Sequence, residues 1–210
     1  MRSDAPRIGI LVSGTGSNLQ AIIEARDRGE LSAELALVVS SAKHAPALAR
    51  ARAASIPARV LELHDRKERA ARIRFEQRLL DTLLPFRLDL LVLAGWMLIL
   101  SGDFLHRCRM PVLNIHPALL EPTGNSPVPV LRGAHCVRDA LRMELPVTGA
   151  TVHLVTDRVD DGPTLAMESI EIVSGDTEET LRRRIQAVEH RILPRAIQGY
   201  LDHTGQGAIT

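Results

Sequence analysis

A hexapeptide near the middle of the chain carries two polar side chains that can act together in catalysis. Residues 112–117 read Val-Leu-Asn-Ile-His-Pro, an apolar strand pattern that contains Asn114 and His116 and stops at a proline. Because side chains alternate along a strand, Asn114 and His116 lie on the same face. An amide donor beside an imidazole that can carry a proton suits an oxygen that gains negative charge during acyl transfer. The hexapeptide alone also fits a loop entrance without chemistry.

A glycine-rich turn near the N-terminus predicts a second site, for a phosphate. The apolar run 8–12 is followed by Ser-Gly-Thr-Gly-Ser-Asn at positions 13–18 and then by residues with helical spacing. Small residues let backbone N–H groups approach an anion, and the helix dipole favours negative charge at this end. A dinucleotide fingerprint needs a third glycine where Leu19 stands, so we predict a monophosphate site and no NAD site. A tight turn without a ligand is the alternative.

The elements that must hold these motifs alternate between strand and helix. This alternation predicts an α/β protein with a Rossmann-like open, mostly parallel sheet and helices on both faces. In such sheets ligands bind beyond the carboxyl ends of the strands, which puts the 14–18 loop, the apolar segment 95–100 and the Asn114/His116 pair along one rim. We predict strands at 8–12, 35–39, 59–63, 88–94 and 112–116. We predict helices from residue 19, at 46–54 and at 66–84. The buried stripe of the last helix is expected to be Ile73, Leu79, Leu80, Leu83 and Leu84.

The second half of the chain is richer in turns. Three prolines and a glycine in residues 121–129 predict a loop. A helix at 133–143 precedes a strand at 148–155, whose alternation puts Thr151 and His153 on a face that we expect to be exposed. A turn dense in carboxylates at 157–163, a strand at 164–173 and a capped helix from Asp176 or Thr177 towards Tyr200 complete the pattern.

Size and composition fit a single domain in a reducing compartment. The 210 residues carry a net charge of +1, so no strong field marks the molecule for nucleic acid or for a membrane. Two cysteines, without zinc-ligand spacing, and a short polar N-terminus without an apolar stretch predict a cytoplasmic protein without a metal site. We expect a tail at 1–7, a domain at 8–202 with a phosphate-binding half at 8–111 and a catalytic half at 112–202, and a tail at 203–210.

Four motifs in the same order resemble those of the folate-dependent glycinamide ribonucleotide formyltransferases of purine biosynthesis. They are SGTGSNLQAI from Ser13, LVLAGWMLILS from Leu91, LNIHPALL from Leu113 and GATVHLVTDRVDDGP from Gly149. The LNIHP motif with the later D-x-G-P is shared by the broader formyltransferase superfamily. The SGTGSNL motif narrows the resemblance to this family and to formyltetrahydrofolate deformylase.

The resemblance implies a role for individual residues and a direct transfer of the formyl group from 10-formyltetrahydrofolate, without a metal. It leaves open a homodimer. It implies that Asn114, His116 and Asp160 are catalytic and that His153 supports them. The residues implied to bind the ribonucleotide are Gly16, Ser17, Asn18 and Glu189. Those implied to bind the folate are Arg72, Met97, Leu98, Ile99, Leu100 and Asn114.

The sequence departs from the family pattern in two places of consequence. Leu98 stands where many members carry arginine, for which we expect a modest effect. Glu121 replaces a proline, and the Pro-rich segment 121–132 is about eight residues longer than the family pattern. This insertion fits a lid, a change of substrate, a partial occlusion or a tolerated surface loop, and we expect the fold to survive its shortening. The alternatives for function are a formyltetrahydrofolate hydrolase, another formyltransferase, or a catalytically impaired ribonucleotide- or folate-binding protein.

Overall fold

The computed structural model describes residues 5–121 and 128–206, and in these residues seven strands form one sheet. The strands are β1 (Arg7–Val12), β2 (Glu34–Ser40), β3 (Ala58–Val60), β4 (Leu90–Leu93), β5 (Val112–His116), β6 (Val147–Leu154) and β7 (Thr164–Glu171). Their order is β3-β2-β1-β4-β5-β6-β7. The pairs β1–β2, β1–β4 and β2–β3 are parallel, and β6–β7 is antiparallel. The predicted mostly parallel α/β class is confirmed.

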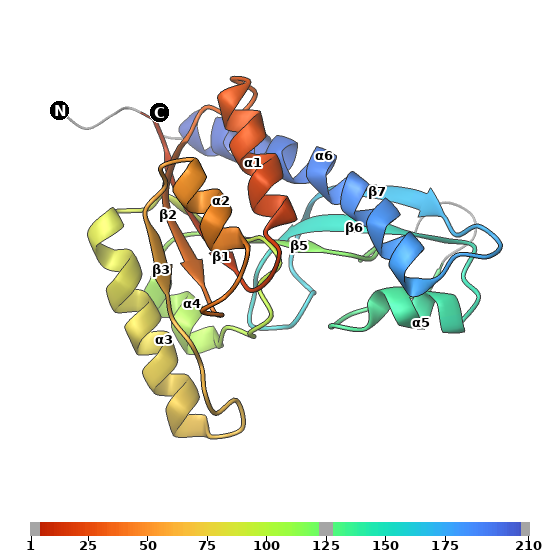
Figure 1. Cartoon of the computed structure of the whole chain (residues 1–210), viewed down its shortest axis with the longest axis horizontal. Helices are drawn as coiled ribbons and strands as arrows, with labels where there is room; N and C mark the ends of the chain where they lie inside the picture. Colours follow the sequence, from red (N-terminus) through yellow and green to blue (C-terminus); the bar gives the residue numbers. More distant parts are fainter. Residues whose placement is uncertain (1–4, 122–127, 207–210) are drawn as a thin grey trace. The chain divides into compact units, whose positions relative to one another are not determined.

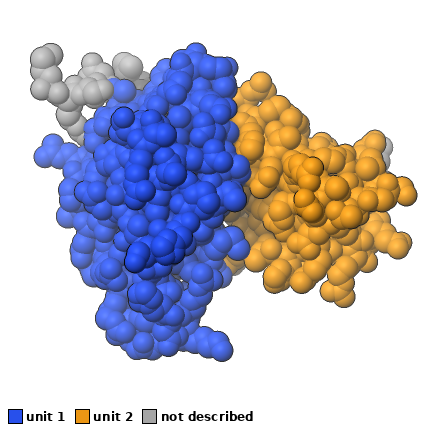
Figure 2. Space-filling model, in the orientation of Figure 1, with its two compact units in different colours: residues 1–113 blue, residues 114–210 orange. Residues whose placement is uncertain are grey.

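The described residues also contain six α-helices, and the chain divides into two compact units between Leu113 and Asn114 (Figures 1 and 2). The helices are α1 (Ser17–Asp27), α2 (Ala47–Ala53), α3 (Arg69–Leu83), α4 (Gly102–Cys108), α5 (Cys136–Arg142) and α6 (Glu178–Gln206). A short 3-10 helix, η1 (Leu84–Phe86), follows α3. No helix in the described part of the chain combines the length and the apolar character that a membrane span requires.

The first unit is built around the buried strands β1, β2 and β4. Every residue of β4 is buried, as is typical of a parallel strand covered on both faces. Helix α1 contacts α2, and α3 contacts α4. The buried stripe predicted for α3 is partly wrong: Ile73 and Leu84 are exposed, and the buried positions include Phe75 and Glu76. Phe75 stacks on Trp96 and Glu76 accepts hydrogen bonds from Ser101, so these contacts decide which face of the helix is covered.

Helix α4 was not predicted from the sequence. Its signal is present in the chain, because the Ser101 hydroxyl accepts a hydrogen bond from the Phe104 N–H at 3.1 Å and so caps the helix. Asp103 in the first turn favours the positive end of the helix dipole, and Phe104 and Cys108 are buried one turn apart. The helix has only seven residues, which is too short for a clear apolar period.

The second unit contains the end of β5 from Asn114, the β6–β7 hairpin, helix α6 lying along it, and helix α5, which contacts α6 (Figure 1). The expectation that one face of β6 is exposed is wrong, because Thr151 and His153 are both buried. The Thr151 hydroxyl donates to the Ala118 carbonyl at 2.7 Å and accepts from the Leu120 N–H at 3.2 Å, so this polar side chain is satisfied inside the protein.

Several elements begin or end away from the predicted residue. Helix α3 starts at Arg69, not at residue 66, and α5 starts at Cys136, not at Gly133. Gly133 has a φ of 84°, which is outside the helical region. Helix α6 continues past Tyr200 to Gln206. Residues 122–127, which belong to the predicted insertion, lie outside the described residues, as do the outermost residues of both predicted tails.

Candidate active site

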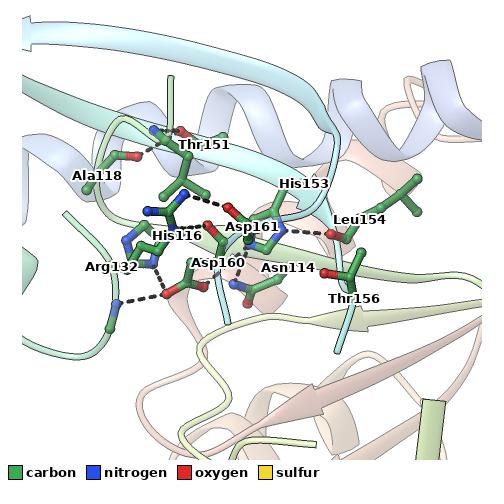
Figure 3. A network of polar contacts seen from close by, with 12 residues as sticks. Asn114, His116, Ala118, Arg132, Thr151, His153, Leu154, Thr156, Asp160 and Asp161 are labelled. Atoms are coloured by element: carbon green, nitrogen blue, oxygen red, sulfur yellow. Dashed lines mark hydrogen bonds and ion pairs between the residues drawn. The ribbon is translucent and has the colours of Figure 1, made fainter. Parts of the chain in front are cut away.

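Four polar side chains from three separate segments converge in the second unit (Figure 3). Asn114 and His116 come from β5, His153 from the end of β6, and Asp160 from the turn between β6 and β7. Asn114 Nδ2 lies 3.1 Å from His153 Nε2, His116 Nδ1 lies 3.4 Å from Asp160 Oδ2, and His153 Nε2 lies 3.6 Å from Asp160 Oδ1. Both histidines are buried, and the Asp160 side chain is 10% exposed.

The hydrogen bonds of His153 define how Asn114 is held. His153 Nδ1 lies 2.8 Å from the carbonyl oxygen of Leu154, which can only accept, so Nδ1 donates. In the neutral ring, Nε2 then carries the lone pair and accepts a hydrogen bond from the Asn114 amide. This contact turns the Nδ2 group of Asn114 towards His153 and leaves one N–H of that group for a further acceptor.

His116 is placed between two oxygen acceptors. Its Nε2 donates to the carbonyl oxygen of Leu131 at 2.8 Å, while its Nδ1 faces the Asp160 carboxylate. Burial lowers the pKa of His116, and the Asp160 charge and the Leu131 carbonyl oppose this effect without cancelling it. The imidazole therefore rests neutral at neutral pH, with its lone pair on Nδ1. A proton taken up at Nδ1 would turn the contact with Asp160 into a charge-assisted hydrogen bond.

Asp160 is held as an anion in a strained turn. Burial raises the pKa of Asp160, but its contact with His153, the positive charge that His116 carries when protonated and the hydrogen bond from the Gly133 N–H together outweigh this effect, so the pKa is lowered. The residue has a φ of 51°, in the left-handed region that side chains other than glycine rarely adopt. Two residues later, a Cβ on Gly162 would come within 1.8 Å of the Leu154 carbonyl oxygen, so the turn can pack here only with glycine.

In the first unit, the glycine-rich segment forms the loop that leads into α1. Gly16 has a φ of 73°, and a Cβ there would lie 2.6 Å from Cβ of Ala47 on α2, so glycine is required on both grounds. Ser17 opens the helix and Asn18 is buried in its first turn. Arg50 of α2, which was not expected at this loop, donates from Nε to the Thr15 carbonyl at 3.0 Å. In the sequence, Arg50 is only one of several basic residues in an Ala/Arg-rich helix, and nothing there indicates a contact with the loop.

The predicted apolar segment lies beside this loop. The Ser13 N–H donates to the Gly95 carbonyl at 3.1 Å, and the Met97 N–H donates to the Ser13 hydroxyl at 2.9 Å. The side chains of Met97 and Ile99 are exposed, although both are large and apolar. At the end of the segment, Ser101 donates to the buried Glu76 from its N–H at 2.8 Å and from its hydroxyl at 2.5 Å.

The remaining predicted site residues are distributed over other elements. Arg72 is exposed on α3, Leu98 is half-buried, Leu100 is buried, and Glu189 is buried on α6. Within residues 5–121 and 128–206, no group of three or more histidine, cysteine, aspartate or glutamate side chains is arranged to hold a metal ion.

Comparison with known proteins defines the class. A family model described as formyl transferase matches residues 6–197, and the chain belongs to this family. It is 35% identical to phosphoribosylglycinamide formyltransferase of Escherichia coli, covering 93% of this chain and 87% of that protein. It is 33% identical to the protein of the same name from Bacillus subtilis, covering 96% of this chain and 97% of that protein.

A solved structure and a longer relative give the same result. The crystal structure of glycinamide ribonucleotide transformylase 1 from Symbiobacterium toebii superposes with a TM-score of 0.85 at 38% identity, covering 96% of this chain and 90% of that one. The human trifunctional purine biosynthetic protein adenosine-3 is 38% identical over 192 residues. This match covers 91% of the chain but only 18% of the human protein, so the chain spans less than a fifth of that relative.

Proposed function

We propose that this protein transfers the formyl group of 10-formyltetrahydrofolate to the amine of glycinamide ribonucleotide, a step of de novo purine biosynthesis. The observation that carries the proposal is the convergence of Asn114, His116, His153 and Asp160 in one buried cluster. The bacterial relatives named for this activity match the chain over almost their whole length, which supports the same assignment.

In the proposed reaction the amine nitrogen attacks the formyl carbon and a tetrahedral oxyanion forms. The second N–H of the Asn114 amide donates to this oxyanion, since the first is directed to His153. The bond between the formyl carbon and N10 of the folate then breaks as the oxyanion collapses to the new amide. Across the whole reaction the amine loses one proton and N10 gains one.

His116 and Asp160 provide the route for that proton. The neutral imidazole accepts a proton, the Asp160 carboxylate stabilises the imidazolium at 3.4 Å, and the proton passes on to N10 through water. Asp160 suits this role because its lowered pKa keeps it anionic throughout. No covalent enzyme intermediate is required.

Substrate binding is assigned to the residues that the resemblance implies. Backbone N–H groups of Gly16, Ser17 and Asn18, at the start of α1, take the ribonucleotide phosphate, and Glu189 serves the glycinamide or ribose. Met97 to Leu100 line the pteridine site and Arg72 meets the folate tail. The exposure of Met97 and Ile99 supports this assignment, because large apolar side chains without cover mark a binding surface.

The cellular setting completes the proposal. Cys108 and Cys136 are both free and buried, which suits the reducing cytoplasm. Sedimentation velocity of the purified chain tests the homodimer that the resemblance leaves open.

The test follows the loss of 10-formyltetrahydrofolate with and without glycinamide ribonucleotide. We expect release of the formyl group that depends on the ribonucleotide amine and yields the formylated ribonucleotide. Release without the ribonucleotide would replace this proposal with a hydrolase. Binding of either substrate without any release would identify a catalytically impaired binding protein.

A further inference from the structure

Three consecutive residues before α5 contact the polar cluster of the second unit. The Leu131 carbonyl accepts from His116 Nε2, and the Gly133 N–H donates to Asp160 Oδ2 at 2.8 Å. Between them, Arg132 donates from Nε to the backbone carbonyl of Asp160 at 2.9 Å and from Nη2 to Oδ1 of Asp161 at 2.6 Å (Figure 3). Arg132 was not among the site residues expected from the sequence.

The turn that carries Asp160 needs such external support. A residue other than glycine in the left-handed region stores backbone strain and persists there only when its surroundings hold it. Asp160, at φ 51°, is such a residue, and its carboxylate reaches His116 from this backbone conformation. Release of the strain would let the backbone relax and would carry the carboxylate away from the imidazole.

The guanidinium of Arg132 fits this turn in a way that other side chains do not. Nε and Nη2 lie on one edge of the planar group, and they meet two acceptors that belong to successive residues of the turn. Both hydrogen bonds are charge-assisted, which makes them shorter and stronger than neutral ones. A lysine could reach one of these acceptors, but its single ammonium cannot reproduce the fork.

We propose that Arg132 is a positioning residue for the reaction: its two hydrogen bonds hold the turn at 160–161 so that the Asp160 carboxylate faces His116. This inference rests on the proposed function, because it takes Asp160 as a group that acts in formyl transfer. Arg132 itself does not touch the substrates in this proposal. Its effect is on the placement of Asp160.

The chain supplies a matched control in Arg158. This residue also lies near the Asp161 carboxylate, with Nη1 3.7 Å from Oδ2, but its side chain is 81% exposed. It makes no hydrogen bond to the Asp160 backbone among the contacts of the described residues. Arg158→Ala therefore removes the same charge from the same carboxylate without removing the support of the turn.

The experiment compares Arg132→Ala, Arg132→Lys and Arg158→Ala in the formyl-transfer assay. A misplacement of about 1 Å can cost about 100-fold in rate. We expect Arg132→Ala to lower kcat by about 10- to 100-fold with KM for the ribonucleotide changed less than about threefold. We expect Arg132→Lys to lie between that variant and the wild type, and Arg158→Ala to stay within about twofold of the wild type.

The pH profile separates positioning from the simple loss of a charge. Burial is the largest influence and lowers the pKa of His116, the Asp160 charge raises it, and the charges of His153 and Arg132 lower it further. A purely electrostatic role predicts that Arg132→Ala moves the acid limb of kcat to higher pH and leaves the plateau unchanged. Positioning predicts a lower plateau. A plateau equal to that of the wild type, or an equal loss in Arg158→Ala, would overturn the inference.

Hydrogen exchange provides a readout that does not depend on activity. We expect amides of the peptide 155–163 to exchange faster in Arg132→Ala than in the wild type or in Arg158→Ala, and unchanged exchange would overturn the inference even in an inactive protein. If Arg132→Ala does not fold, Asp161→Ala removes the other end of the same bond and is expected to give the same faster exchange and lower kcat. Absence of ribonucleotide-dependent transfer in the wild type would count against the proposed function alone.

Discussion

The loop before α1 and the polar cluster beside β5 are constructed in opposite ways. The loop is one contiguous segment, and its conformation depends on a glycine with a φ of 73° packed against Ala47. The cluster is assembled from side chains of β5, β6 and the turn at Asp160, and its members touch one another through nitrogen and oxygen atoms. The first site therefore depends on backbone shape, and the second depends on the identity of each side chain.

This difference predicts different responses to mutation. A site made of backbone groups is sensitive to any substitution that changes the backbone conformation. Such a substitution should weaken ligand binding and lower the stability of the fold together. In a buried cluster of titratable groups each group is adjusted by the others, so removal of one should affect turnover and its pH dependence.

The largest effect is expected for Asp160→Asn in the cluster. The amide keeps the size of the carboxylate but removes the charge that would stabilise the imidazolium of His116 at 3.4 Å. We expect kcat to fall by about 100- to 10,000-fold, with a small change in KM for the ribonucleotide. Asp157→Asn, at an exposed position of the same turn, is the control and should keep the activity. Unchanged turnover in Asp160→Asn would remove this residue from the catalytic machinery.

The second effect is expected for Gly16→Ala in the loop. The added Cβ would meet Cβ of Ala47 at 2.6 Å and would hold alanine at a positive φ. We expect a loss of about 1–3 kcal/mol in the free energy of unfolding and a higher KM for the ribonucleotide, with kcat affected less. Gly14→Ala is the matched control for stability, because a Cβ there meets no atom within 4 Å. Equal unfolding midpoints for the two variants would show that the loop does not require glycine at position 16.

The same contrast explains which part of each site could be predicted from the sequence. The loop was found because a strand, two glycines and a helix start are contiguous, and Asn114 and His116 were paired by the two-residue period of a strand. Asp160 was assigned only through the resemblance to a family, because a carboxylate 44 residues after His116 has no local signal. Arg132 could not be found at all, since its partners, the Asp160 carbonyl and the Asp161 carboxylate, lie 28 and 29 residues away in the sequence.

The errors in the fold have the same origin. Alternation along β6 predicted an exposed face for Thr151, but tertiary hydrogen bonds to Ala118 and Leu120 allow this polar residue to be buried. The buried stripe predicted for α3 was wrong at Ile73, which is exposed. The helix instead buries Glu76, which is bound by Ser101, 25 residues away in the sequence. Periodicity reports local pattern, and these positions are determined by distant partners.

A third, smaller effect concerns the dependence of stability on pH, and we expect it to come from the cluster and not from the loop. The pKa of His116 is lowered from 6.5, so the unfolded chain binds this proton more readily than the folded one. The stability contribution is therefore present above about pH 6.5 and is lost as the pH falls. The contribution of Asp160 to stability is also lost as the pH falls. Because the pKa of Asp160 is lowered from 3.8, this loss occurs only in stronger acid.

The contribution of His116 to stability can therefore be measured by thermal unfolding between about pH 7 and 5. Each tenfold difference in proton affinity between the folded and the unfolded chain corresponds to about 1.4 kcal/mol. We expect the wild-type Tm to fall over this range and the fall to be smaller in His116→Gln. His64→Gln, at an exposed position, should behave as the wild type. An identical pH dependence in His116→Gln and the wild type would contradict the burial of a neutral imidazole.

The smallest effect is expected at Cys136, a nucleophilic side chain just behind the cluster. Its Sγ contacts the carbonyl of Pro117 at 3.5 Å, and burial raises its pKa to about 11. At pH 7.5 roughly one molecule in 3,000 then carries the thiolate, too few for covalent catalysis. We expect Cys136→Ser to keep kcat within about twofold and iodoacetamide to label neither cysteine of the native protein. A large loss of turnover in Cys136→Ser but not in Cys108→Ser would mean that the cluster acts on a thiol, and direct attack by the substrate amine would then be the wrong mechanism.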